Sequence, residues 1–237
     1  LILKVPFYLW VQTFLNDATL HTKGFTLKAQ TFGQGTLGGS LGFIKSGDTL
    51  DIEVEGDVNN QRGKIEVAEE AEVVSKNGDI FVGQGIGSGH RQKNGAYIMS
   101  HTKLRLKSRN MTFSFGEVGS SGPLSLEFAN QLVLESARIK TSGETLFQGK
   151  SAIIKRADPW TRELIHPIPD DESWVCNPCY WNGQHRQKVG GDASEVLGGA
   201  NIRFLVDRVA IMASRVAAMD DITDKRGRKV THKKPGE

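Results

Sequence analysis

Hydrophobic and polar residues alternate one by one through most of the first two thirds of the chain. Residues 25–30 (FTLKAQ) and 50–55 (LDIEVE) show the pattern clearly, and comparable runs recur as far as residue 154. Turn sequences such as Asn-Gly and Ser-Gly separate the runs. A period of two is typical of strands buried on one face, and Asn-Gly is a strong hairpin signal. The pattern predicts a mainly β protein with an antiparallel multi-strand sandwich, a jelly roll or an elongated meander.

The two ends of the chain have a helical spacing instead. Residues 1–15 place apolar side chains at positions 7, 10, 11 and 14, with Pro6 in the expected first turn. Residues 201–221 carry apolar side chains at intervals of three and four. This spacing predicts a short N-terminal helix and a C-terminal amphipathic helix. For the N-terminal stretch, a processed anchor remnant and a strand remain as alternatives.

These patterns divide the chain into five parts. The parts are an N-terminal helix or lead-in (1–23), an antiparallel β domain (24–156), an irregular arm rich in Pro, Trp and Cys (157–200), an amphipathic helix (201–221) and a basic tail (222–237). The arm shows no sustained period of either kind, which is why it is expected to be irregular.

A glycine motif, Gly33-x-Gly35-x-x-Gly38, resembles the phosphate-binding turn of a dinucleotide fold only in its spacing. That turn requires a buried strand before it and a helix after it. The preceding run alternates, and residues 37–46 contain three glycines, each costing about 1 kcal/mol in a helix. We therefore interpret these residues as turn and bulge glycines, as the total of 27 glycines in 237 residues also favours.

Charge is distributed unevenly along the chain. The formal net charge is +3, and a C-terminal cluster of cations accounts for it: Lys225, Arg226, Arg228, Lys229, Lys233 and Lys234. Six cations could neutralise phosphates in a salt-dependent way. A nucleic-acid-associated protein is therefore one alternative function.

The only two cysteines form a CxxC motif, Cys176-Asn-Pro-Cys179, with His166 before it and His185 after it. Two thiolates and two imidazoles could complete a tetrahedral zinc site. The second half lacks the regular spacing of a zinc finger, so a small disulfide loop and two free thiols remain as alternatives. We expect no cofactor other than this zinc ion.

Catalytic motifs are not recognisable. The chain has neither G-x-S-x-G nor H-E-x-x-H. Lys103, Arg105 and Lys107 share one face of an expected strand, opposite Leu104 and Leu106. Such a row could meet phosphate or acidic lipid, but a solvated sheet face is the simpler interpretation.

The sequence therefore predicts a non-enzymatic structural subunit of a larger complex, such as a virion, phage-tail or envelope assembly, rather than a free cytoplasmic enzyme. It would bind neighbouring subunits, as a homo- or hetero-oligomer, through its C-terminal arm and helix. The expected interface residues are Trp160, Trp174, Trp181, Leu205, Val209, Met212 and Val216. No segment is long and apolar enough to span a membrane as a helix.

A third function considered is a carrier of a hydrophobic ligand, bound in a groove on the concave side of the sheet. The side chains expected to line that groove are Phe113, Phe115, Leu126, Phe128, Leu132 and Leu134.

Overall fold

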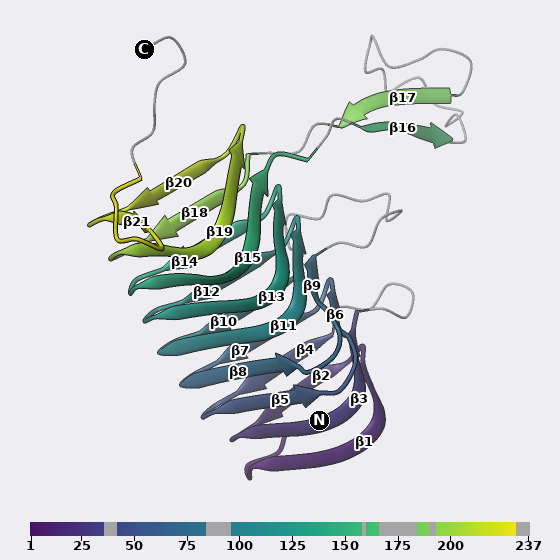
Figure 1. Ribbon diagram of the computed structural model, residues 1–237. Coiled ribbons are helices and arrows are strands. Elements are labelled where there is room, and N and C mark those ends of the chain that lie inside the picture. Colours follow the sequence, from purple (N-terminus) through teal and green to yellow (C-terminus); the bar gives the residue numbers. More distant parts are fainter. Residues whose placement is uncertain (36–41, 84–95, 158–159, 166–183, 190–192, 231–237) are drawn as a thin grey trace, which may run out of the picture.

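Two parallel β-sheets face each other along the whole length of the protein (Figure 1). The computed structural model describes residues 1–35, 42–83, 96–157, 160–165, 184–189 and 193–230. In these residues the regular structure is β-strand, and no helix occurs.

The long sheet has eleven strands. They are β1 (Phe7–Asn16), β3 (Phe25–Gln34), β5 (Leu50–Val54), β6 (Val58–Gln61), β8 (Glu70–Ser75), β9 (Ile80–Gly83), β11 (Lys103–Ser114), β13 (Leu124–Glu135), β15 (Thr145–Lys155), β19 (Ile202–Met212) and β21 (Ile222–Asp224).

The short sheet has eight strands of four residues each. They are β2 (Thr19–Thr22), β4 (Phe43–Ser46), β7 (Lys64–Val67), β10 (Tyr97–Ser100), β12 (Glu117–Ser120), β14 (Arg138–Thr141), β18 (Glu195–Gly198) and β20 (Arg215–Ala218). A separate antiparallel hairpin contains β16 (Trp160–Ile165) and β17 (Gln184–Val189).

The chain alternates between the two sheets and returns to the long sheet one strand further along. Leu50 pairs with Ala71 and Leu124 pairs with Thr145, each 21 residues on, and Leu104 pairs with Leu124, 20 residues on. Each long strand, or split pair of strands, and the short strand after it therefore form one coil of about 20 residues. Stacked coils of this kind make a β-solenoid, in which each coil contacts its neighbours.

Side chains that point inward form columns along the axis of the solenoid. One column contains Ile80, Met111, Leu132 and Ala152, which pair in register and are at most 1% exposed. In another column the rings of Phe147 and Phe204 are stacked with their centroids 4.7 Å apart. Because every coil repeats the same inward positions, the core is continuous from one end to the other.

Buried hydroxyls complete the turns from the short sheet to the long sheet. The single proton of Ser46 Oγ is shared between the Lys23 and Thr49 carbonyl oxygens, and that of Ser100 Oγ is shared between those of Glu69 and Lys103. Ser120 occupies the equivalent position in a later coil and bonds the Thr102 carbonyl. These hydroxyls thus supply hydrogen bonds to carbonyl oxygens at the turns between the two sheets.

The expected strands are present, but the prediction of an antiparallel sandwich or jelly roll is wrong. Every strand pair in the two large sheets is parallel, and only β16–β17 is antiparallel. Alternation predicts which face of a strand is buried, but it does not predict the direction of the neighbouring strand. Here the intervening short strand carries the chain back before each new long strand begins.

The two expected helices are also wrong, for a shared reason. Residues 1–15 contain β1, and residues 201–221 contain β19 and β20. Each long strand bends at its middle, and the bend adds one residue to the inward spacing. In β19 the inward residues are therefore 202, 204, 206, 209 and 211, and in β1 they are 7, 9, 11, 14 and 16. The interval of three at the bend imitates the spacing of an amphipathic helix.

Candidate functional site

The turn from each long strand to the following short strand is here called the insertion corner. Two residues close it at 17–18, 62–63, 115–116, 136–137 and 213–214. The first of these residues has a positive φ in four of the five turns, at Arg62, Phe115, Ser136 and Ala213. Gly35 follows β3 with φ 69°, which confirms it as a turn glycine.

Three longer connections leave the solenoid at this same corner. They span residues 35–42, 84–96 and 156–194. The opposite turns, from the short sheet back to the long sheet, contain two or three residues in every coil. The insertions thus emerge along one edge of the solenoid, on the side where Figure 1 shows β16 and β17 extending away from the stack.

The largest insertion is fixed at both of its ends. The Ala157 amide donates to Ser136 Oγ at 2.9 Å, and Ser194 Oγ donates to the Lys155 carbonyl at 2.7 Å. Ser194 Oγ also accepts from the Ala137 amide. Ser194 is fully buried, so the insertion leaves and re-enters the coil at rigid positions.

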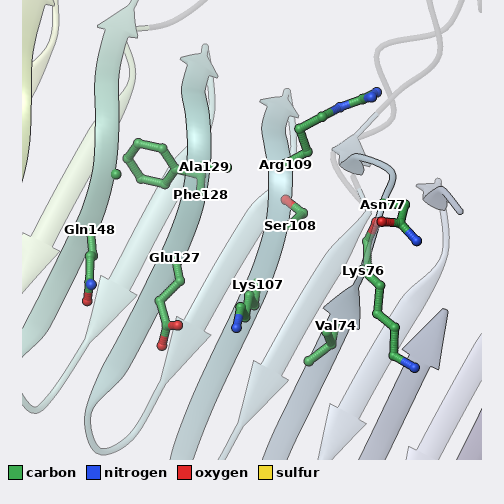
Figure 2. Close-up of a pocket in the computed structure, with 12 residues that line it drawn as sticks. Val74, Lys76, Asn77, Lys107, Ser108, Arg109, Glu127, Phe128, Ala129 and Gln148 are labelled. Carbon is green, nitrogen blue, oxygen red and sulfur yellow. The ribbon is translucent and has the colours of Figure 1, made fainter. Parts of the chain in front are cut away.

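A second candidate site is a groove on the outer surface where the long strands bend, here called the bend groove. β8, β11, β13 and β15 line it, and register shifts mark the bend between Ser108 and Asn110 and between Phe128 and Gln131. Lys107, Glu127 and Gln148 pair in register and extend from neighbouring strands in a row (Figure 2). The Phe128 ring packs against Gly149 and is only 3% exposed, so it offers no stacking platform.

Arg105 is the centre of the charge network beside the groove. Its Nε and Nη2 donate to the two carboxylate oxygens of Glu127 at 2.7 and 2.9 Å, and its Nη1 donates to Glu72 at 2.6 Å. The bond from Arg105 holds the pKa of Glu127 below its usual range, despite partial burial. In β5, on the other side of Glu72, burial first and then the charges of Glu72 and Glu53 raise the pKa of Asp51.

Most other charges at the groove are also paired across coils. Lys76 Nζ lies 2.6 Å from Glu53 and 2.7 Å from Glu55, and Arg109 bonds Asp79 at 3.1 Å. Lys107 forms no ion pair with the described residues. The groove therefore combines nearly balanced charges with one free ammonium group, and it has no strong excess of either sign.

The chemistry available in the groove is limited. Glu127, ionised and held by Arg105, is poorly suited to donate a proton. Ser108 Oγ donates to the Asn110 carbonyl at 2.6 Å and is 6% exposed, which makes it unsuited to nucleophilic attack. Within the described residues, no three His, Cys, Asp or Glu side chains come together as metal ligands.

The predicted face of Lys103, Arg105 and Lys107 is confirmed as an outer sheet face. Leu104 and Leu106 are fully buried on the opposite side of β11. The sequence pattern did not reveal the partners Glu72 and Glu127. They lie 33 and 22 residues from Arg105 in neighbouring coils, and only knowledge of the coil length would have located them.

Most of the predicted zinc and aromatic residues cannot be placed. Cys176, Cys179, His166, Trp174 and Trp181 lie outside the described residues. Trp160 begins β16 and His185 belongs to β17, in backbone register with Leu164. The zinc site thus stays a prediction.

The predicted interface residues of the C-terminal region are divided between the two sheets. Leu205, Val209 and Met212 belong to β19, and Val216 belongs to β20. Val209 is 41% and Met212 is 49% exposed, whereas Leu205 and Val216 are half-buried. The last coil leaves the second half of β19 uncovered, because β21 pairs only with Ile202–Phe204.

The described part of the basic tail folds back on this end of the solenoid. Lys225 Nζ lies 2.6 Å from Asp207, Arg228 lies 2.6 Å from Asp224, and Lys229 lies 2.8 Å from Asp221. The Val230 amide donates to the Ile222 carbonyl at 2.8 Å. Lys233 and Lys234 lie outside the described residues.

Five of the six side chains expected to line a hydrophobic groove belong instead to the closed core. Phe113, Leu126, Leu132 and Leu134 are fully buried and Phe128 is 3% exposed. Phe115 is a residue of the insertion corner. A hydrophobic ligand could contact these five side chains only if the packed core opened to make space for it.

Comparison with protein-family models, with curated proteins and with solved structures gives no match. The described residues contain no helix of the length and apolarity needed to cross a membrane. The parallel sheets overturn the expected jelly roll, and no finding supports a virion or phage assembly.

Proposed function

We propose that this protein is a non-enzymatic structural subunit: a rigid β-solenoid that holds inserted segments along one edge for contact with neighbouring proteins. The observation that carries the proposal is the shared insertion corner. Three connections of different length leave the coils at one position, while the opposite turns contain only two or three residues. Loops on a rigid scaffold are where binding residues concentrate.

Two features of the described residues favour this function over the alternatives. Three of the four described tail cations already have acidic partners, which leaves fewer charges for nucleic-acid phosphates. The inward side chains fill a continuous core, which leaves no groove for a hydrophobic ligand. The described residues of the bend groove contribute mostly paired charges, and the Ser108 hydroxyl there is buried and already hydrogen-bonded.

The 156–194 insertion is the best candidate for the contact with a neighbouring protein. Lys155 pairs with Glu135, and Glu195 pairs with Arg138, so Arg156 and Ser194 occupy the two corner positions of Ser136 and Ala137. Deleting residues 157–193 joins these two residues and recreates the corner of the preceding coil. The solenoid is therefore expected to fold without the insertion.

The test compares the full chain with this deletion variant in a pull-down from lysate of the source cells, and in cross-linking of the purified protein. Far-UV circular dichroism and the melting temperature should stay close to those of the full chain, whereas at least one retained protein should be lost. Deletion of residues 36–41, which joins Gly35 to Gly42, removes a shorter insertion of the same edge and shows whether that protein depends on the long insertion alone or on several insertions together. If the 157–193 deletion retains every protein that the full chain retains, the proposal is wrong.

A further inference from the structure

Five polar side chains at the bend of the long sheet form no hydrogen bond or ion pair with the described residues. They are Lys107 on β11, Asn130 and Gln131 on β13, and Gln148 and Lys150 on β15, here called the free polar set. Gln131 is half-buried and the other four are exposed. Lys107 and Gln148 line the bend groove (Figure 2), and the other three directly follow its lining residues in the sequence. The set therefore lies along the groove on three neighbouring strands.

Most charged side chains around the free polar set are paired between coils. Arg105 bonds both carboxylate oxygens of Glu127, and Lys155 Nζ lies 2.9 Å from Glu135 on the neighbouring strand. Such pairs occupy the donors of the cations and the acceptors of the acids. The ammonium and carboxamide groups of the free polar set differ from these surroundings, because they remain available to a ligand.

The free polar set leaves two positive charges without a partner. Three acidic side chains at the bend are each bonded by another cation: Asp79 by Arg109, Glu127 by Arg105 and Asp207 by Lys225. Lys107 and Lys150 form no ion pair with the described residues. Since neighbouring strands lie about 4.8 Å apart, the two lysines are separated by about 10 Å across the strands.

The two kinds of side chain in the set select for two kinds of ligand group. A carboxamide both donates and accepts hydrogen bonds, as a ligand hydroxyl does, so the two are complementary. An ammonium group only donates, and its strongest partners are carboxylate, sulfate or phosphate oxygens. A ligand that contacts the whole set therefore carries many hydroxyls, with anionic groups spaced well apart. A sugar chain with an acidic group on some of its units has this composition.

A nucleic acid fits the same surface less well. Phe128 is the aromatic residue that lines the described groove, and at 3% exposure its ring is closed to a stacking base. A nucleic-acid strand also carries a phosphate about every 3.4 Å along its axis, which is a much closer spacing than that of Lys107 and Lys150.

We propose that the bend groove and the free polar set bind an acidic polysaccharide, whose chain crosses β11, β13 and β15 along the axis of the solenoid. Carboxylate or sulfate groups of the chain bind Lys107 and Lys150. Hydroxyl groups between them bind the carboxamides of Asn130, Gln131 and Gln148. Because the groove lies on the outer surface and crosses several coils, it takes an internal segment of the chain, and stacked coils are suited to such extended ligands.

The experiment measures affinity by isothermal titration calorimetry at about 0.05 M salt, where screening of exposed charges is weak. The probes are heparin fragments, which carry sulfate, oligogalacturonate, which carries carboxylate, and neutral dextran. The full chain is expected to bind at least one acidic probe, and the tighter of the two identifies the anionic group. Dextran should bind much more weakly, because it offers hydroxyls alone.

The decisive variant is Lys107→Gln with Lys150→Gln. It should bind the acidic probe about fivefold more weakly, because two exposed ion pairs are lost. Both lysines are exposed, so the circular-dichroism spectrum and the melting temperature should stay close to those of the full chain. Gln148→Ala should cause a smaller loss that persists at high salt, because it removes a hydrogen bond rather than a charge.

The matched control is Lys23→Gln with Lys140→Gln. Both of these lysines are exposed, and neither forms an ion pair with the described residues. Lys23 lies in the turn before β3 and Lys140 on the outer face of β14, in the short sheet. The control removes the same total charge away from the groove, so it should leave the affinity unchanged.

Four results would overturn the proposal. They are a full chain that binds neither acidic probe, dextran bound as tightly as they are, an equal loss of affinity in the control variant, and an unchanged affinity in the Lys107 and Lys150 variant. Single-stranded DNA or poly-glutamate serves as a competing polyanion. If either binds more tightly than both polysaccharides and is weakened by the same variant, the groove is specific for that polymer and the proposal is wrong.

The polysaccharide site does not depend on the insertion corner. The 157–193 deletion keeps every residue of the free polar set, so it should bind the acidic probe as the full chain does. Failure of the pull-down test would therefore leave the calorimetric result standing, and failure of the calorimetric test would leave the pull-down result standing.

Discussion

In the first described coil, β1 is a ten-residue strand without a charged side chain. At the C-terminal end, β19 carries Asp207 and Arg208, and residues 222–230 fold back over its first half with three ion pairs. The two long strands share the same inward spacing, yet only β19 carries charged side chains. Identical coil geometry therefore leaves the sequence of each strand to set the charge on its outer face.

Within one core column, a buried and an exposed side chain should contribute differently to the free energy of unfolding. Ile154 and Ile211 pair in register and belong to one column, but Ile154 is fully buried and Ile211 is 41% exposed. Ile154→Ala should lower the free energy of unfolding by about 3 kcal/mol, because it leaves a cavity inside the stack. Ile211→Ala should cost under about 1 kcal/mol, because water already reaches this side chain.

Urea unfolding followed by circular dichroism measures the free energy of unfolding of both variants. The dependence of this free energy on urea concentration should be the same for the two variants. Similar losses for the two variants would show that Ile211 is covered in solution, contrary to the exposed end described above.

At the insertion corner, two substitutions are expected to change the free energy of unfolding by smaller amounts and in opposite directions, one in an early coil and one in the last complete coil. Gly35 has φ 69°, and a Cβ there would collide with the Gln61 carbonyl oxygen, so Gly35→Ala should cost about 2 kcal/mol. Ala213, at the same corner of the last complete coil, has φ 47°. Ala213→Gly should increase stability by about 0.5 kcal/mol, because relief of the left-handed strain outweighs the added chain entropy.

Melting temperatures of the two variants against the full chain provide the measurement. Destabilisation by Ala213→Gly would show that the strain at this corner is smaller than the entropy that alanine removes from the unfolded chain.

Local pattern was enough to predict most of the strands between residues 25 and 155, but not their arrangement. Leu50, Ile52 and Val54 alternate with polar residues and are buried in β5, as their period indicates. What the pattern lacked was the interval of 20 or 21 residues, which the three insertions interrupt between Phe25 and Leu50, Ala71 and Leu104, and Thr145 and Ile202. Parallel pairing depends on that interval, and so do the ion pairs of Arg105.

The bend of the long strands explains the remaining error. An extra residue between Val206 and Val209 gives β19 a helical spacing, although Ile202, Phe204 and Val206 before it alternate as in any half-buried strand. The same bend creates the groove near Lys107 and Phe128, so the signal that concealed the strand also marks the candidate site. The predicted zinc site is neither confirmed nor contradicted, since both cysteines fall outside the described residues.

The smallest predicted effect concerns the fold-back that protects the C-terminal end. The side-chain bond from Arg228 first, then the backbone N–H groups of Arg228 and Arg226, lower the pKa of Asp224 from its usual 3.8. Lys225 likewise lowers the pKa of Asp207. A carboxyl group with a lowered pKa stabilises the folded arrangement fully above its ordinary pKa, and this contribution is lost as the pH falls through the lowered value.

Acidification from pH ~6 to pH ~2.5 should therefore release residues 225–230 while the coils persist. The nuclear magnetic resonance signal of the Val230 amide, which bonds the Ile222 carbonyl, should move toward its unstructured position over this range. The Phe7 amide, bonded to Gly24 at the other end, should stay in place. Asp224→Asn removes the charge that Arg228 binds, so it should shift Val230 already at pH ~6 and flatten its pH dependence. A Val230 signal that is unchanged by both treatments would show that apolar packing near Val206 and Ile211, rather than Asp224, holds the fold-back.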